Sequence, residues 1–244
     1  MFDFLFRKKQ AIQAQLPFAT DIHAHIVPGV DDGADDLEES IQLVRALHKM
    51  GVNRIIATPH RTDETFENSV ETIQPAFDQL KQALATEQIP VTIDYSFEYR
   101  MDEGFMQLLK ENKIRPLSKN YVLVENSFIQ ALWNLDELLF DLKLKGFIPI
   151  LAHPERYAYY HQHKEVYDKL HHTGCLFQVN ILSFAGHYGK PVKETALWLL
   201  KKGYIDFCGT DIHHQGHATL IEKFLQSKEY QKIKAQLTLH NETL

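Results

Sequence analysis

Short apolar, β-branched segments alternate along this chain with longer segments of helical periodicity, and this alternation constrains the fold most. The seven strand candidates are residues 18–26, 52–60, 91–99, 121–126, 147–154, 175–181 and 204–213. The helix candidates are residues 35–51, 67–88, 102–113, 131–146, 165–174, 193–203 and 217–237. A helix between two strands supplies the crossover that parallel pairing requires, so the pattern predicts a mostly parallel sheet.

Two helix candidates carry clear boundary signals. In 35–51, Asp35 or Asp36 can cap the first turn, and Gly51 suits the end of the helix. In 67–88, Pro75 is expected to kink or split the helix, because proline lacks the backbone donor that a helix interior uses.

A parallel sheet either closes into a barrel or stays open with helices on both faces. The sequence contains neither Gly-x-Gly-x-x-Gly nor the P-loop pattern, which weakens the open nucleotide-binding folds. Seven units therefore predict an α/β fold of the TIM type, a distorted (β/α)7 barrel with one unit fewer than usual. A length of 244 residues suits one domain. We expect that domain over residues 18–244, after an N-terminal extension over residues 1–17.

The stretch TDIHAHIVPGVDDG, residues 20–33, places His23 and His25 two residues apart. Residues i and i+2 of a strand point to the same face, so both imidazoles should face the barrel interior. Histidine or acidic residues also lie near the carboxyl ends of most other strand candidates. The full set is His23, His25, Asp32, His60, Glu98, Glu125, His153, Asp211 and His213. Because these strand ends converge on one mouth of a barrel, the nine side chains should meet there.

Each of these residues has an ordinary explanation when it is taken alone: Glu125 could be a paired core carboxylate, and His60 could hydrogen-bond a carbonyl. Gathered in one mouth, they would be costly to bury unless divalent cations held them. Nitrogen and carboxylate ligands without thiolate suit Mn, Fe, Zn or Mg, and disfavour a structural cysteine-type zinc site. Nine ligands are too many for one ion, so we expect two or three ions, with Glu98 as a bridging carboxylate.

Arg156, in the segment HPER after the fifth strand candidate, is a candidate for phosphate binding. A guanidinium presents fixed donors that match phosphate oxygens in pairs. A salt bridge to Glu155 or Asp168 explains Arg156 equally well on sequence alone. Arg61 and Arg100 also follow strand ends and are weaker candidates for the same role.

Composition disfavours several functional classes. A formal net charge of -6 disfavours nonspecific binding to nucleic acid or anionic membrane. No apolar run approaches the ~20 residues of a membrane-spanning helix, and the start MFDFLFRKKQ has the wrong charge order for a signal peptide. The two cysteines, Cys175 and Cys208, are few, which suits a reducing compartment and a cytoplasmic location. Neither begins a Cys-x5-Arg loop, so a cysteine-based phosphatase is disfavoured.

Seven motifs follow one another from about Thr20 to His214: DIHAH, PGVDDG, ATPH, SFEYR, LVEN, LAHPERY and GTDIHH. As a set they resemble the polymerase-and-histidinol-phosphatase (PHP) family, and more closely its manganese-dependent protein-tyrosine phosphatases of capsule and exopolysaccharide synthesis. The resemblance implies a (β/α)7 barrel with three metal ions, held by the nine residues named above. It also implies that Arg156 contacts phosphate and that the substrate is phosphotyrosine in the C-terminal tail of a capsule-assembly tyrosine kinase.

One departure from the family pattern concerns the side of the site that follows Asp211 and His213. The resemblance implies a second arginine shortly after these residues, whereas IHHQGHATL contains none. His214 or His217 could take its place.

The expected reaction is hydrolysis of phosphotyrosine by a hydroxide that the metal ions generate near neutral pH. Phosphoryl transfer mainly requires positioning and charge stabilisation, so no cysteine nucleophile is needed. The first alternative is a phosphatase for histidinol phosphate or another small phosphomonoester. An amidohydrolase-type barrel is a second, although its usual carboxylated lysine is replaced here by Glu125. A catalytically inactive, metal-stabilised binding module is a third.

Overall fold

The computed structural model describes residues 14–63 and 65–244 of the chain. Most of the predicted N-terminal extension, residues 1–17, lies outside the described residues. Its last residues lie against the body of the protein: Leu16 is buried, and its backbone N–H donates to the carbonyl of Met50 at 2.9 Å.

The strands coincide with the seven predicted segments, except that β3 and β5 each end one residue beyond them. In the described residues they are β1 (Thr20–Asp21), β2 (Arg54–Ala57), β3 (His60–Arg61), β4 (Thr92–Tyr95), β5 (Glu98–Arg100), β6 (Tyr121–Glu125), β7 (Ile148–Ala152), β8 (Leu176–Asn180) and β9 (Phe207–Gly209). Two predicted segments, 52–60 and 91–99, are each divided into two strands. Pro59 separates β2 from β3, because it has no backbone N–H to continue the ladder.

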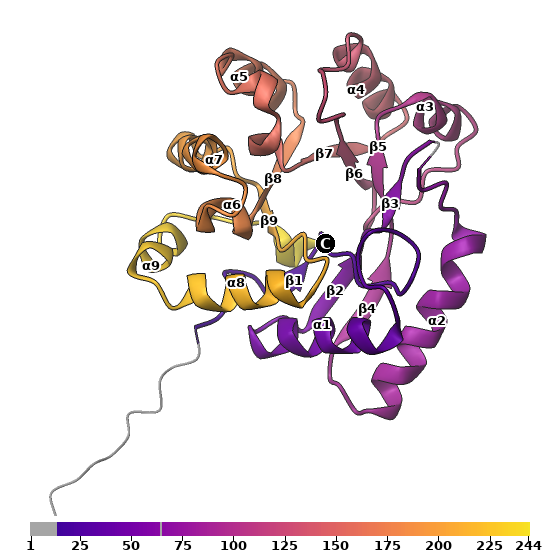
Figure 1. Ribbon diagram of the computed structural model, residues 1–244. Helices are drawn as coiled ribbons and strands as arrows, with labels where there is room; N and C mark the ends of the chain where they lie inside the picture. The colour runs from indigo at the N-terminus through magenta and orange to yellow at the C-terminus, as the bar shows by residue number, and fades with distance from the viewer. Residues whose placement is uncertain (1–13, 64) are drawn as a thin grey trace, which may run out of the picture.

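All pairings between these strands are parallel, in the orders β1-β2-β4 and β3-β5-β6-β7-β8-β9. A parallel bridge between Ala24 and Ile212 joins the chain after β1 to the chain after β9. The Asp211 N–H donates to the His23 carbonyl there, at 2.8 Å. The protein is therefore a mixed α/β fold with a curled parallel sheet, and Figure 1 shows the helices around its outside.

The longer helices correspond to predicted segments. In the described residues the helices are α1 (Leu37–Lys49), α2 (Val70–Thr86), α3 (Glu103–Lys110), α4 (Leu135–Leu144), α5 (Glu165–His172), α6 (Ile181–Ala185), α7 (Lys190–Lys202), α8 (Gln215–Leu225) and α9 (Lys228–Lys234), with short 3-10 turns at Pro154–Arg156, Ala158–Tyr160 and Asn241–Thr243. None of them is both long enough and apolar enough to traverse a bilayer. The Asp36 side chain caps α1 by accepting from the Glu39 N–H at 2.9 Å, as predicted.

Three details differ from the predicted helices. Pro75 does not split α2, which was one of the two effects predicted for it; it lies in the second turn, and Glu71, whose carbonyl loses its helical partner, is exposed. The segment 217–237 forms two helices, because Ser227 caps a new one by accepting from the Tyr230 N–H at 3.0 Å. The short helix α6 follows β8 directly and was not predicted.

Apolar side chains pack on both faces of the curled sheet. The outer layer lies between the strands and the helices and includes Val122 and Val124 of β6. The inner cluster, on the other face, consists of Ile22, Ile56, Leu117, Leu123, Ile150, Ala152, Phe207 and Leu244. Alternate residues of a strand share a face, so Leu123 in the inner cluster is followed on the same face by Glu125. The inner face therefore changes from apolar to charged toward the carboxyl end of β6.

Candidate metal centre

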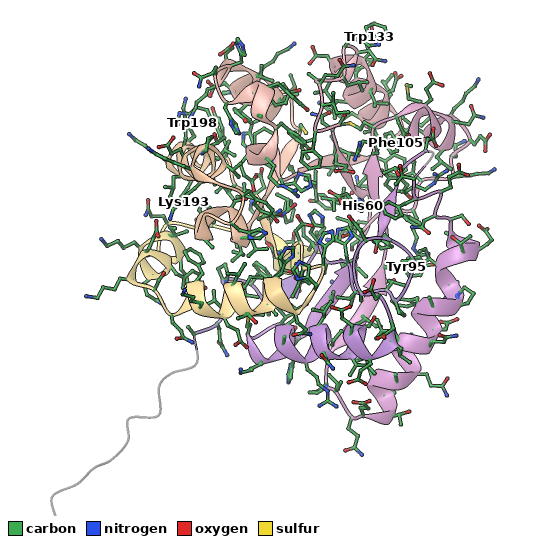
Figure 2. All side chains as sticks on the ribbon, in the orientation of Figure 1. His60, Tyr95, Phe105, Trp133, Lys193 and Trp198 are labelled. Atoms are coloured by element: carbon green, nitrogen blue, oxygen red, sulfur yellow. The ribbon has the colours of Figure 1, made fainter. Side chains whose placement is uncertain are left out.

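The carboxyl ends of the strands bring together all nine side chains that were predicted to bind metal. Four groups of them have potential ligand atoms within 4.8 Å of one another in the described residues: His25, Asp32, His60 and His213; His23, Glu98 and His153; His23, His25 and Asp211; and His60, Glu98 and Glu125. Figure 2 shows His60 near the middle of the molecule, among other nitrogen-bearing side chains. Because the groups share members, they form one continuous polar centre.

His23 and His25 point their Nε2 atoms toward each other at 3.3 Å. Their other ring nitrogens are already engaged: Nδ1 of His23 lies 2.7 Å from Oε1 of Gln178, and Nδ1 of His25 lies 2.7 Å from Oδ2 of Asp31. Since amide and carboxylate oxygens accept hydrogen bonds, Nδ1 carries the hydrogen in the neutral form of each ring, and Nε2 of that form has a free lone pair. Two such lone pairs facing each other in a buried pocket favour a cation between them.

Glu98 lies at the middle of the centre and is fully buried. Its Oε2 lies 3.3 Å from Nε2 of His23 and 3.0 Å from Nδ1 of His60. Its Oε1 lies 2.8 Å from Nε2 of His153. The strand register places His60 directly opposite Glu98, which brings these two residues together through backbone pairing alone. A carboxylate that reaches three imidazoles through both oxygens is suited to bridging two ions.

A rim group lies closer to solvent. Oδ1 of Asp32 is 3.3 Å from Nε2 of His60 and 3.6 Å from Nε2 of His213. The Asp32 side chain is 58% exposed, whereas His23 and Glu98 are fully buried. Asp32 lies on the loop after Pro28 and Gly29 and can therefore approach a ligand from the solvent side.

Several polar atoms of the centre have no hydrogen-bond partner although they are buried. They include His60 Nδ1, His153 Nδ1, and one oxygen each of Glu98 and Glu125. His60 Nδ1 and Glu98 Oε2 are close, yet their geometry does not make a hydrogen bond. Unsatisfied buried donors and acceptors are costly, so atoms of this kind that converge on common points fit a cation.

The electrostatics of the centre also fit a cation. Burial acts to lower the pKa of His23, but the carboxylates of Glu98 and Asp211 outweigh it and raise the pKa to about 9. Burial raises the pKa of Glu125 to about 7, with the nearby charge of Glu98 acting in the same direction. The pocket therefore favours positive charge on His23 and disfavours further negative charge at Glu125. Divalent cations would supply that positive charge without protonating the ligands.

Residues that the sequence analysis did not identify hold the candidate ligands in place. On β8, the only predicted strand without a histidine or acidic residue at its end, Gln178 contacts His23 as described above. Nδ2 of Asn180 donates to Oδ2 of Asp211 at 2.6 Å, and Nε2 of Gln178 donates to Oδ1 of Asn180 at 2.8 Å. The sequence indicated a different role for this strand only by the absence of a histidine or acidic residue at its end, whereas the other six predicted strands have one. Hydrogen bonds of this kind orient metal-binding side chains and select their tautomers.

The backbone around the centre is locally unusual. His153 and Asp211 adopt left-handed φ values of 34° and 50°, which non-glycine residues rarely do. At Gly209 a Cβ atom would lie 2.7 Å from the Cβ of His23, too close for a side chain. Such conformations cost free energy and concentrate at functional sites.

Arg156 lies at the edge of the centre, with its guanidinium between two aromatic rings. Its carbon Cζ is 4.7 Å from the centre of the Phe128 ring and 4.3 Å from that of Tyr188. Its Nη1 donates to Oδ2 of Asp211 at 3.0 Å. Neither predicted salt-bridge partner is used: Glu155 accepts from Asn180 and Ser183 instead, and Asp168 pairs with Lys202. Arg156 is therefore held beside the candidate ligands.

The two histidines considered as substitutes for a second arginine line the same cavity as Arg156, which measures about 360 Å³. His217 is buried, and its Nδ1 accepts from the His213 N–H at 3.3 Å. His214 caps α8 by accepting from the Gly216 N–H. Burial, with the neighbouring His214, lowers the pKa of His217 to about 4. A neutral His217 does not replace the positive charge of an arginine.

Comparison with known proteins identifies the family of this chain. A family model described as capsular polysaccharide synthesis, CpsB/CapC, matches residues 19–242. The chain belongs to the CpsB/CapC family. Among its relatives, the tyrosine-protein phosphatase YwqE of Bacillus subtilis is 35% identical over 195 residues, covering 80% of this chain and 77% of YwqE. The tyrosine-protein phosphatase CpsB of Streptococcus agalactiae is 30% identical over 200 residues, covering 80% of this chain and 82% of CpsB.

The structural comparison agrees with the family. A crystal structure from a study of YwqE from Bacillus subtilis and CpsB from Streptococcus pneumoniae superposes with a TM-score of 0.75 and 31% identity. The superposition covers 90% of this chain and 96% of the matched chain, and YwqE and CpsB are described as unique metal-dependent tyrosine phosphatases. YwqE and CpsB are thus metal-dependent tyrosine phosphatases, and the polar centre is the part of this CpsB/CapC chain suited to holding metal.

Proposed function

We propose that this protein is a metal-dependent protein-tyrosine phosphatase that acts in capsule or exopolysaccharide synthesis. The observation that carries this proposal is the convergence of imidazoles and carboxylates at the carboxyl ends of the strands, in a chain whose family relatives are tyrosine-protein phosphatases. We further propose that its substrate is a phosphotyrosine in the C-terminal tail of a tyrosine kinase.

We propose that the nine residues of the polar centre are the metal ligands and that they hold two or three manganese ions. More than one ion is supported by the buried nitrogens and oxygens of His60, His153, Glu98 and Glu125 that have no hydrogen-bond partner, because they lie at different points of the centre. Nitrogen and carboxylate ligands suit manganese, and they also accept iron, zinc or magnesium.

The chain itself performs two tasks in the proposed reaction. Arg156 binds the phosphoryl oxygens, because the Phe128 and Tyr188 rings fix its plane while several N–H donors remain for substrate. Gln178 and Asp31 keep the ring hydrogens of His23 and His25 on Nδ1, so that Nε2 can ligate. The nine residues of the centre would hold divalent ions, which would supply Lewis-acid charge and lower the pKa of a bound water.

The proposal also includes the fold and the cellular location of the protein. We propose one domain over residues 18–244 with the distorted (β/α)7 arrangement, supported by the bridge between Ala24 and Ile212 that links the first and last strand segments. Cys175 and Cys208 are free and buried, which supports a reducing, cytoplasmic location.

The proposal is tested with manganese-loaded protein and three phosphomonoesters: a phosphotyrosine peptide, the matching phosphoserine peptide and histidinol phosphate. We expect the phosphotyrosine peptide to have the largest kcat/KM. Preference for histidinol phosphate would instead assign a small-molecule phosphatase. Loss of turnover with all three, with metal retained, would indicate a binding module.

Arg156→Lys tests the phosphate contact. Lysine keeps the charge but loses the paired donors, so KM for the phosphotyrosine peptide should rise roughly 10- to 100-fold while the bound metal is unchanged. The matched control is Arg45→Lys on α1, whose arginine pairs with Glu87 on the surface. Unchanged kinetics in Arg156→Lys would make Arg156 a structural residue.

A further inference from the structure

Phe128 is an exposed aromatic residue at the entrance to the polar centre. It lies in the segment after β6, three residues past Glu125, and 41% of it is exposed to solvent. Its ring stacks on His153, with centroids 5.5 Å apart and planes at 25°, and the Arg156 guanidinium lies over it. These contacts fix the ring while a large part of its surface remains in water.

Two cavities meet at Phe128. The smaller, of about 360 Å³, contains Arg156 and Tyr188. The larger, of about 680 Å³, is lined among others by Phe66 and Met101. Phe128, Asp32 and His60 line both cavities. The larger cavity therefore opens directly onto the candidate metal ligands and has apolar surface on its walls.

Phe66 repeats the arrangement of Phe128 at another ligand. Its ring stacks on His60, with centroids 5.7 Å apart and planes at 13°. Each aromatic wall of the larger cavity is thus supported by an imidazole of the polar centre. A group bound to phosphorus through a single oxygen must lie within a few ångströms of the ions, and this adjoining cavity offers it an apolar surface.

We propose that Phe128 and Phe66 bind the aromatic ring of the substrate in the larger cavity, so that they select aryl over alkyl phosphate groups. This inference rests on the proposed phosphatase function and specifies its substrate class. A phenyl ring stacks or packs edge-to-face against Phe128, whereas a linear alkyl chain gains only the burial of its own area. Arg156 and the ions bind the phosphoryl group in either case, so discrimination depends on the two phenylalanines.

The test measures binding, without turnover, of phenylphosphonate and butylphosphonate to manganese-loaded protein by titration calorimetry. The wild type should bind phenylphosphonate more tightly. Phe128→Leu should reduce that preference by about 2- to 12-fold, the range that aromatic pairs contribute beyond buried area. Phe66→Leu should reduce it in the same direction. Leucine keeps an apolar side chain at these partly exposed positions, so both variants should fold.

Two controls separate the ring site from its neighbours. Tyr188 is the other ring beside Arg156, and it lines only the smaller of the two cavities. Tyr188→Leu should therefore weaken the binding of both phosphonates by the same factor. Phe140→Leu makes the same change on α4, away from both cavities, where the phenylalanine is 59% exposed, and it should alter neither affinity.

Each result decides the inference. A wild type without preference for phenylphosphonate, or a Phe128→Leu variant that keeps the whole preference, would overturn it. A loss of preference in Tyr188→Leu equal to that in Phe128→Leu would also overturn it, because the ring would then lie in the smaller cavity. If the preference depends on Phe128 but phosphotyrosine peptides are not hydrolysed, the aryl site stands and the proposed function fails.

Discussion

The two ends of the curled sheet use the same inward strand face for different purposes. Toward the amino end this face carries the inner cluster, including Leu123 and Phe207. Toward the carboxyl end it carries charge: Glu125 lies two residues beyond Leu123, and Asp211 lies four beyond Phe207. Side-chain alternation places both kinds of residue on one face, so a few ångströms along a strand separate stabilising burial from reactive chemistry.

The two ends also differ in how their buried polar groups are satisfied. At the amino end the C-terminal segment supplies partners: the Asn241 side chain hydrogen-bonds the backbone N–H and carbonyl of Cys208, and Glu242 accepts from the N–H and hydroxyl of Thr20. Figure 1 shows the C-terminus close to β1 and β2. At the carboxyl end, buried atoms of His60 and Glu98 remain without partners. These polar groups at the amino end find their partners within the protein, whereas the unpaired atoms at the carboxyl end fit a cation.

The largest expected effect comes from removing charge at the middle of the carboxyl end. Glu98→Gln keeps the size of the side chain but removes the negative charge that reaches three imidazoles. At least one ion should be lost, and kcat/KM for a phosphotyrosine peptide should fall roughly 1000-fold, about 4 kcal/mol of transition-state stabilisation. Elemental analysis and steady-state kinetics measure the two quantities.

Asp94→Asn is the matched control for Glu98→Gln. Asp94 lies on β4, the strand that precedes β5 in the chain, but it is about half-exposed and pairs with Arg115. We expect full metal content and activity in this variant. A Glu98→Gln protein with the same metal and activity as Asp94→Asn would refute the distinction between the two ends.

Removing the metal should destabilise the two ends unequally. At ion concentrations of 100 to 1000 times Kd, bound metal contributes about 3–4 kcal/mol to the free energy of unfolding. Chelation should therefore lower Tm by roughly 6–16 °C, measured by scanning calorimetry. Hydrogen exchange should accelerate at the Asp211 amide, which donates to His23, more than at the Cys208 amide, which donates to Asn241. Equal acceleration of exchange at both amides would contradict the expected difference between the two ends of the sheet.

The convergence of the nine polar side chains could be predicted because it needs only two local facts. Side chains alternate along a strand, and the carboxyl ends of parallel strands meet. Candidates such as His60 and Glu98 could therefore be placed from their positions in strand segments, whereas Asp32 lies on a loop. The structure confirms that these side chains meet, while their role as ligands stays a prediction.

The supporting residues could not be predicted because their partners are distant in sequence or are selected by the backbone of a loop. Gln178 hydrogen-bonds His23, 155 residues away, and in QVN it resembles an ordinary polar strand residue. Asp31 and Asp32 are adjacent, and the loop backbone decides that Asp31 turns to His25 while Asp32 stays at the rim. The two rings around Arg156 likewise come from separate segments.

Gln178→Leu tests whether a supporting residue at the carboxyl end acts through the metal. Leucine leaves Nδ1 of His23 without its acceptor, so the imidazole can rotate or change tautomer. The affinity for manganese should fall about 10- to 100-fold, the usual cost of losing such a contact. Competition against a chromophoric chelator measures it, with Gln82→Leu on the exposed face of α2 as the control. Unchanged affinity would show that His23 does not depend on Gln178.

The smallest expected effect concerns the amino end. Ile150 is fully buried in the inner cluster, and Ile150→Val removes one methylene from it. The free energy of unfolding should fall by about 0.5–1.5 kcal/mol in urea denaturation, while the number of bound ions and their affinity stay the same. Ile129→Val, at a position that is 89% exposed, should change neither quantity. The inner cluster and the polar centre adjoin along the strands. A loss of metal affinity in Ile150→Val would therefore mean that packing in the inner cluster controls metal binding in the polar centre.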